Sequence, residues 1–253
     1  MASVRGRVPA ISAHRGGGDG HGGGTYQGYL NAVAAGADYV EFDVRQTGDG
    51  VLVALHDARA GPGRPLASVS YSQLCGLAGH EVPRVAQVMR LLAGRAVAHV
   101  DLKDAGCAAA VARLGLELVG PAGMVMTTGD SALLARLQAQ FPAVPVGLSI
   151  GGGLARAARR SLAPLRTMAL SRAELAAAEM ADWAVIQWRL ARAEVLAHCQ
   201  RRGIKTMVWT VNADRDLARW VVTPGVDALV TDRPARAIFL RDQHSHDAGR
   251  PGS

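Results

Sequence analysis

Eight short runs rich in β-branched residues alternate with amphipathic stretches rich in Ala, Leu and Arg along almost the whole chain. The expected strands are residues 10–14, 38–43, 96–102, 123–127, 144–149, 183–188, 205–211 and 226–231. The expected helices lie near residues 25–35, 105–118, 130–140, 153–160, 173–180, 191–202, 213–221 and 234–241. This alternation is typical of a parallel α/β barrel, which needs about 250 residues, and the chain has 253. The sequence therefore predicts an α/β fold, a single-domain (β/α)₈ TIM barrel over residues 1–241, followed by a disordered polar tail over residues 242–253.

One segment interrupts the alternation. Asp49-Gly50 is a hairpin turn signal, and it leads into a second apolar run that ends before His56. Residues 58–83 follow as an irregular excursion rich in Gly and Pro, long enough to form part of a lid. An open doubly wound sheet is the alternative architecture, but no GxGxxG pattern follows the first strand. We therefore favour the barrel with a small hairpin and an excursion after its second strand.

Composition limits the partners and the location. The net charge is +7, but 26 of the 28 basic residues are scattered Arg and aromatic residues make up only 4%, which argues against a nucleic-acid surface. A basic surface instead favours anionic, phosphorylated small molecules. The three cysteines lack metal-site or disulfide spacing. With neither a long apolar run nor a secretory signal, the sequence predicts a cytoplasmic protein without a membrane span; it does not indicate an oligomeric state.

Charged side chains gather where the expected strands end, which is where barrel enzymes place their chemistry. These residues are His14, Arg15, Glu41, Asp43, His56, Asp101 and Lys103. Three carboxylates that converge repel one another unless a cation joins them, and all-oxygen ligation favours Mg²⁺, Ca²⁺ or Mn²⁺. The two basic residues suit a phosphate, and two histidines allow one to act as base while the other protonates a leaving group. Together these groups indicate phosphodiester cleavage.

Six blocks of the chain, in order, resemble the glycerophosphodiester phosphodiesterases, a family of TIM barrels related to the phosphoinositide phosphodiesterases. The blocks begin with His14-Arg15-Gly16, the stretch from Gly36 to Val44, and the stretch from Val53 to Asp57. Asp101-Leu102-Lys103, the stretch from Val208 to Asn212, and the stretch from Gly225 to Pro234 complete them. The resemblance covers roughly residues 10 to 235 and implies the same barrel fold.

The resemblance also implies a role for each matched residue. Glu41, Asp43 and Asp101 would hold one divalent cation, with Mg²⁺ the first expectation and Ca²⁺ or Mn²⁺ the alternatives. His14 and His56 would be the acid–base pair. Arg15, Lys103 and Trp209 would contact the substrate, the last as an apolar wall. The family reaction releases an alcohol and glycerol 3-phosphate, in many members after attack by the glycerol 2-hydroxyl.

Three departures from the family pattern concern substrate choice. Gly22-Gly23-Gly24-Thr25 replaces the usual Pro-Glu-Asn-Thr, an Arg-Thr-Thr segment is absent after His56-Asp57, and Asp101 stands where most members carry Glu. With Asp at this position, the chain is similar to the sphingomyelinase D-like enzymes. The alternatives are therefore a specialised biosynthetic or lysophospholipase D-like phosphodiesterase of the same fold, or a catalytically weak barrel that binds a phosphorylated ligand.

Overall fold

A computed structural model describes residues 8–18, 23–152 and 172–248 of the chain. The strands are Ala10–Ala13 (β1), Tyr39–Gln46 (β2), Leu52–Ala54 (β3), Val97–Leu102 (β4), Met124–Thr128 (β5), Val146–Ile150 (β6), Trp183–Gln187 (β7), Lys205–Trp209 (β8) and Ala228–Thr231 (β9). The α-helices are Tyr26–Ala34 (α1), Tyr71–Ala78 (α2), Val85–Leu92 (α3), Ala108–Leu118 (α4), Ser131–Gln140 (α5), Arg172–Ala178 (α7), Ala193–Arg202 (α8), Asp214–Trp220 (α9) and Pro234–Ala248 (α10).

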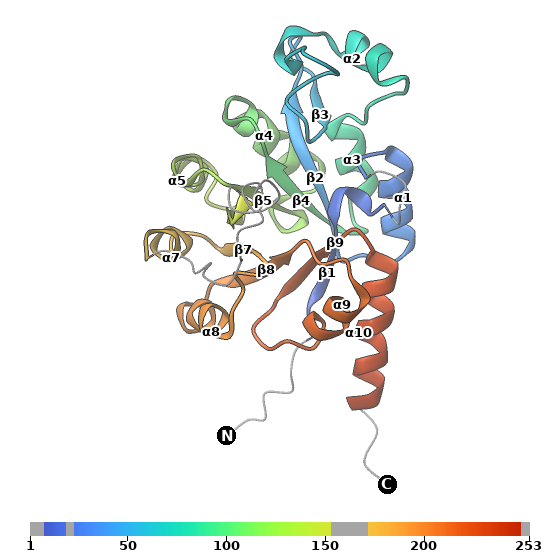
Figure 1. Cartoon of the computed structure of the whole chain (residues 1–253). Coiled ribbons are helices and arrows are strands. Elements are labelled where there is room, and N and C mark those ends of the chain that lie inside the picture. The colour runs from blue at the N-terminus through green and yellow to red at the C-terminus, as the bar shows by residue number, and fades with distance from the viewer. Residues whose placement is uncertain (1–7, 19–22, 153–171, 249–253) are drawn as a thin grey trace.

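Eight parallel strands close into a barrel. They follow the order β1-β9-β8-β7-β6-β5-β4-β2, and the pairing of β1 with β2 closes the ring. Figure 1 shows helices arranged around these strands. The architecture is the predicted (β/α)₈ barrel, and all eight expected strands are present. None of the helices in the described part of the chain is long and apolar enough to cross a membrane.

An aromatic contact identifies the face of each strand that points into the barrel. The rings of Tyr39 on β2 and Trp183 on β7 meet edge to face at 6.0 Å, although these two strands are not neighbours in the sheet. The two side chains therefore meet across the interior. Because side chains alternate along a strand, Glu41 and Asp43 point into the barrel with Tyr39. The opposite faces of the strands pack against the helices in the main hydrophobic core.

Two helices begin or end at residues suited to that position. The Asp130 side chain accepts hydrogen bonds from the backbone of Ala132 and Leu133 at the start of α5. Gly203, with φ +71°, ends α8 in the left-handed conformation that favours glycine. The helix expected near residues 153–160 lies outside the described residues.

The excursion after β2 is more ordered than the sequence analysis predicts. β3 pairs antiparallel with β2 as the expected hairpin, but residues 58–83 also contain α2, which a capping box between Ser70 and Gln73 opens. The segment packs on Val53 of β3 in a small apolar cluster, separate from the main core, that also contains Ala60, Leu66, Val69, Leu74 and Val82. A backbone hydrogen bond of 2.8 Å from Ala54 to Pro83 closes its neck. The prediction of an irregular segment was therefore wrong, because local capping and apolar contacts order it.

Two further differences concern helices. No helix is expected from the sequence between the excursion and β4, where α3 buries Val88, Met89 and Leu92 against the barrel. α10 continues to Ala248, past residue 242, where a disordered tail was expected. A helix can continue through polar residues because its backbone hydrogen bonds are satisfied within the helix.

Candidate active site

Three carboxylates meet inside the barrel near the ends of neighbouring strands. Glu41 and Asp43 lie on β2, and Asp101 lies on β4 in register with Asp43. One carboxylate oxygen from each residue lies within 4.8 Å of the other two. Glu41 and Asp43 are almost fully buried. This all-oxygen donor set can hold one divalent cation, as the sequence analysis predicts.

The environment shifts the pKa values of the two carboxyl groups of β2 in opposite directions. Burial, together with the charge of Asp43, raises the pKa of Glu41 to about 8. Burial also acts to raise the pKa of Asp43, but the nearby Lys103 and Arg15, with a smaller effect from His56, outweigh it and lower that pKa. Of the two carboxyl groups of β2, Asp43 therefore stays ionised more firmly than Glu41.

Two basic side chains lie against this cluster. The Arg15 Nε atom is 2.9 Å from Asp43 Oδ2, and Lys103 Nζ forms ion pairs with Asp43, at 3.0 Å, and with Asp101. Burial acts to lower the pKa of Lys103, but these two carboxylates raise it above its usual value. Both side chains are thus held as cations beside the candidate metal ligands, where an anionic group bound to the cluster would meet them.

A tight turn at the end of β1 places Arg15 and His14. Arg15 has φ +50°, and its backbone N–H donates to Glu41 Oε2 at 2.7 Å. Gly16 also has a positive φ, and a Cβ there would lie 2.7 Å from the Tyr29 ring. The turn therefore requires glycine at position 16, which explains the third residue of the His14-Arg15-Gly16 block.

His14 is held by a polar network that sequence reasoning did not assign. Its Nδ1 lies 2.6 Å from Asp232 Oδ1, and its Nε2 lies 4.0 Å from Glu41 Oε2. Asn212 donates its side-chain amide to the other oxygen of Asp232. Burial acts to lower the pKa of His14, but Glu41 and Asp232 outweigh it and raise that pKa. The network leaves Nε2 as the His14 nitrogen on the side of the carboxylate cluster.

His56 lies outside the barrel, on the loop that follows β3. Its side chain is 47% exposed, and its Nδ1 lies 2.8 Å from Asp57 Oδ1. The loop starts beside the cluster, because the Leu55 N–H donates to the Asp43 carbonyl at 2.9 Å. The structure therefore places His56 at the rim of the site.

Trp209 lies on a different side of the mouth, on β8. Its indole N–H donates to the Val185 carbonyl of β7 at 3.0 Å, which fixes the ring across the neighbouring strand. The ring edge reaches toward Gly152, which follows β6. The half-buried indole thus presents an apolar surface on this side of the mouth.

A second set of hydrogen-bonded side chains that sequence reasoning missed lies next to Asp101. The Thr127 hydroxyl donates to Asp101 Oδ1 at 2.8 Å and lies 3.3 Å from His99 Nε2, while Ser12 contacts the other nitrogen of the same ring. Burial lowers the pKa of His99 to about 3, so this histidine is neutral at neutral pH. The spacing of two residues between His99 and Asp101 is the sequence signal that places both on the inner face.

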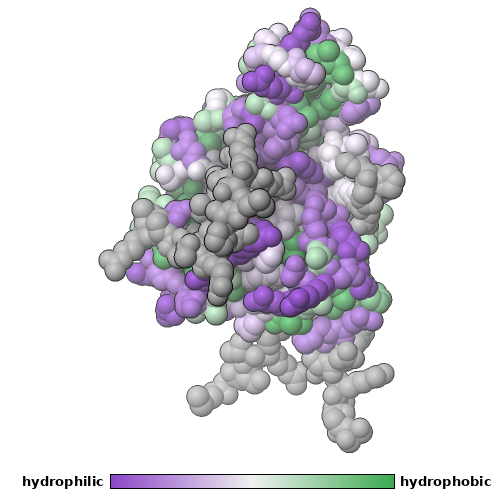
Figure 2. Space-filling view, in the orientation of Figure 1, coloured by the Kyte–Doolittle hydropathy of each residue, from purple (hydrophilic) through white to green (hydrophobic). Residues whose placement is uncertain are grey.

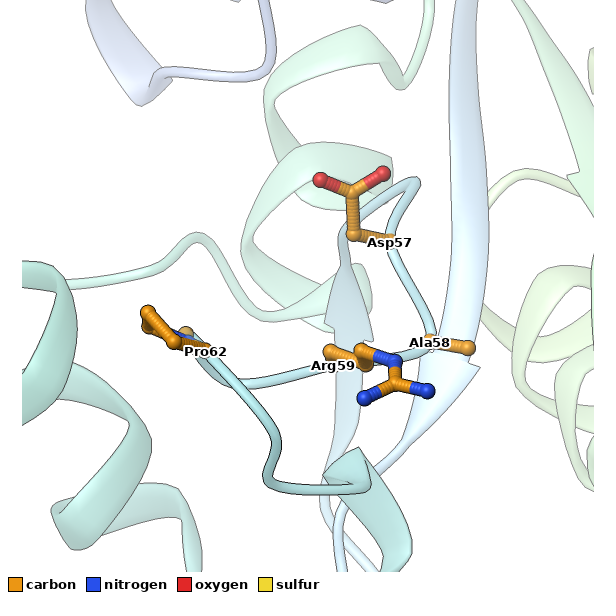
Figure 3. A pocket seen from close by; sticks show the side chains of 5 residues that line it. Asp57, Ala58, Arg59 and Pro62 are labelled. Atoms are coloured by element: carbon orange, nitrogen blue, oxygen red, sulfur yellow. The ribbon is translucent and has the colours of Figure 1, made fainter.

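The surface around the site is mostly polar. Figure 2 shows hydrophilic residues gathered between the excursion and helices α9 and α10. The residues that follow His56 in the chain form an open hollow of about 410 Å³, lined by Asp57, Ala58, Arg59, Gly61 and Pro62. Figure 3 shows the Arg59 guanidinium pointing away from the Asp57 carboxylate. This hollow belongs to the excursion, whereas the carboxylate cluster lies in the barrel.

Comparison with known proteins gives one consistent result. The model of the "Glycerophosphoryl diester phosphodiesterase family" matches residues 14–91 and 93–236. A glycerophosphodiester phosphodiesterase of Caldanaerobacter subterraneus subsp. tengcongensis is 23% identical, over 91% of this chain and 96% of its own length.

Solved structures agree with the fold. The crystal structure of a protein from Silicibacter pomeroyi DSS-3, named as a glycerophosphoryl diester phosphodiesterase, superposes with a TM-score of 0.70 at 23% identity, covering 95% of this chain and 96% of its own. A phosphodiesterase of Oleispira antarctica, solved with the product sn-glycerol-3-phosphate, also gives a TM-score of 0.70 at 17% identity, over 93% of this chain and 97% of its own. Both similarities extend over the whole barrel.

Proposed function

Because the chain belongs to the glycerophosphoryl diester phosphodiesterase family, we propose that it hydrolyses a small glycerophosphodiester to a phosphomonoester and an alcohol. The observation that carries this proposal is the buried cluster of Glu41, Asp43 and Asp101 with Arg15 and Lys103 against it. The product bound to the Oleispira antarctica phosphodiesterase makes glycerol 3-phosphate the first candidate product.

The carboxylate cluster is the proposed site of one divalent cation, with Mg²⁺ the first choice and Ca²⁺ or Mn²⁺ the alternatives. When bound, such a cation neutralises charge on the phosphoryl oxygens. The side chains of Arg15 and Lys103 exchange part of their contact with the carboxylates for contact with the phosphate. Their charges then balance the charge that develops on the phosphoryl group.

His14 and His56 are the proposed proton carriers. His14 Nε2 takes the proton of the attacking hydroxyl, either water or the glycerol 2-hydroxyl, as the new oxygen–phosphorus bond forms. Attack by the 2-hydroxyl gives a cyclic phosphate, which water then opens to the phosphomonoester in a second step. The bond to the leaving oxygen breaks, and protonated His56 gives that oxygen its proton. Asp232 favours His14 as the base, because it holds a proton on Nδ1 and leaves Nε2 able to accept one. Trp209 contacts the organic part of the substrate.

Turnover of glycerophosphocholine tests this proposal most directly. We expect activity to be lost in EDTA and restored by Mg²⁺, with Ca²⁺ and Mn²⁺ compared in parallel. The Asp43→Asn variant should remain folded and lose most activity, while Asp242→Asn, at an exposed residue of α10, should behave as wild type. Full turnover by Asp43→Asn in chelator-treated buffer would contradict the metal role. Binding of glycerol 3-phosphate without turnover of any diester head group would favour a binding barrel.

A further inference from the structure

The side chain of His56 has little to fix its position. The partner of its ring is Asp57, which is itself 77% exposed. An exposed contact of this kind is weak, and it does not hold an imidazole at one place. A proton donor must nevertheless stay within hydrogen-bond reach of the leaving oxygen. The position of His56 must therefore come from its backbone.

Arg45 supplies that backbone support. It lies on β2, two residues beyond Asp43, and its side chain is only 15% exposed. Its Nε donates to the His56 carbonyl at 2.7 Å, and its Nη1 donates to Asp104 Oδ1 at 2.6 Å. One planar guanidinium thus joins the His56 loop to the segment that follows β4.

Asp104 completes the support on the side of β4. It comes directly after Lys103, and its other oxygen accepts a longer hydrogen bond of 3.4 Å from the Gln46 backbone. A guanidinium with donors in one fixed plane orients both of its partners, which a lysine ammonium cannot do in the same way. The strands that carry the carboxylate cluster therefore also set the position of the His56 backbone.

We propose that Arg45, held by Asp104, is a positioning residue that places His56 at the leaving oxygen of the substrate. The inference rests on the proposed function, in which His56 is the general acid. Without Arg45 the loop remains attached through Leu55 but loses the contact at His56 itself. A displacement of about 1 Å in a reacting group can cost about a hundredfold in rate.

Two substrates separate this role from a general loss of structure. Choline leaves glycerophosphocholine as an alkoxide that needs a proton, whereas p-nitrophenol leaves a p-nitrophenyl diester of glycerol phosphate as a stable phenolate. We expect Arg45→Met to lower kcat for glycerophosphocholine at least about tenfold and to leave kcat for the p-nitrophenyl diester within about twofold. A merely structural role would lower both rates alike. Arg95→Met, at an exposed residue before β4, is the control for loss of one positive charge.

A double variant makes the test stricter. Arg45→Met combined with His56→Ala should be no slower on glycerophosphocholine than His56→Ala alone, because both changes remove the same proton transfer. Asp104→Asn should give a smaller effect with the same substrate preference, since its amide oxygen can still accept from Arg45. This milder variant also provides the test should Arg45→Met fail to fold.

Two outcomes would overturn the inference in different ways. If His56→Ala discriminates between the two substrates but Arg45→Met and Asp104→Asn do not, Arg45 does not position the acid, and the proposed function stands. If His56→Ala itself lowers both rates equally, the acid role of His56 is wrong and the role of Arg45 falls with it.

Discussion

Replacing Asp232 by asparagine changes the contact that orients His14 without changing the size of the side chain. In the native network one oxygen of Asp232 faces His14 Nδ1 and the other accepts from the Asn212 amide. In Asp232→Asn, the new amide oxygen would turn toward Asn212, because two NH₂ groups would otherwise face each other. The new NH₂ group would then face His14 Nδ1 and force the ring proton onto Nε2. His14 could no longer accept a proton there.

The size of the effect follows from two contributions. A hydrogen bond to a charged group contributes about 1.5–3 kcal/mol, and we take the lower end because the Asp232 side chain is 40% exposed. Since 1.36 kcal/mol corresponds to about tenfold in rate, loss of the charge alone lowers kcat about tenfold. The change of tautomer adds to this loss. We therefore expect kcat for glycerophosphocholine to fall about a hundredfold, with cation binding and thermal stability largely kept.

A second substitution should restore much of this loss. Asn212→Asp combined with Asp232→Asn exchanges the donor and the acceptor between the two positions, so the amide oxygen at 232 can face His14 again. Asn212 Oδ1 accepts hydrogen bonds from the Asp232 backbone N–H and the Thr231 hydroxyl. A carboxylate oxygen at position 212 can accept both of them as well. We expect the exchange variant to recover about tenfold in kcat over Asp232→Asn.

Steady-state kinetics at saturating Mg²⁺, with thermal unfolding as the control for folding, would measure all three proteins. An Asp232→Asn variant with kcat near that of the wild type would refute the argument that Asp232 sets the tautomer of a catalytic His14. A large loss that the exchange variant does not recover would show that the carboxylate acts by its charge rather than by orienting the ring.

Three further predictions concern stability. Gly16→Ala should lower the free energy of unfolding by clearly more than Gly36→Ala, since both have positive φ but only the first places a Cβ against Tyr29; equal losses in urea titrations would contradict the contact. Asp130→Ala should cost about 1 kcal/mol in the same measurement by removing the cap of α5, and no change would argue against that cap. His99 is neutral in the folded protein and becomes protonated on unfolding below pH 6.5, so it makes stability rise with pH between about 3 and 6.5. His99→Gln should therefore reduce the loss of stability between pH 7 and pH 5 by about 2 kcal/mol. An unchanged loss would mean that a group other than His99 takes up the proton on unfolding.

The barrel and its acidic cluster could be predicted because they depend on local periodicity. A spacing of two residues on a strand fixes the common face of Glu41 and Asp43, and the parallel pairing of β4 with β2 then places Asp101 beside Asp43. α3 had a comparable signal, since its apolar residues recur at helical spacing, but it lies directly after the Gly- and Pro-rich segment. Thr25, the residue kept from the family's usual motif, caps α1 through the Gly28 N–H.

The supporting contacts could not be predicted in the same way. Asp232 meets His14 across 218 positions of sequence, and Arg45 reaches a backbone carbonyl that any residue at position 56 would offer. Such contacts depend on side-chain directions at the mouth of the closed barrel, and the spacing of residue types does not encode them. Asp104, next to Lys103, likewise gives no sequence signal that separates it from an ordinary surface carboxylate.

The excursion is a segment that could be exchanged as a unit. Its two ends are joined at the neck by the hydrogen bond from Ala54 to Pro83, and its apolar cluster is separate from the main core. A segment of different length or composition could therefore replace it while the ring of eight strands stays closed. The same segment follows directly after the His56 loop at the rim of the site. Evolution or an engineer can thus change which diesters reach the cluster without rebuilding the scaffold that holds it.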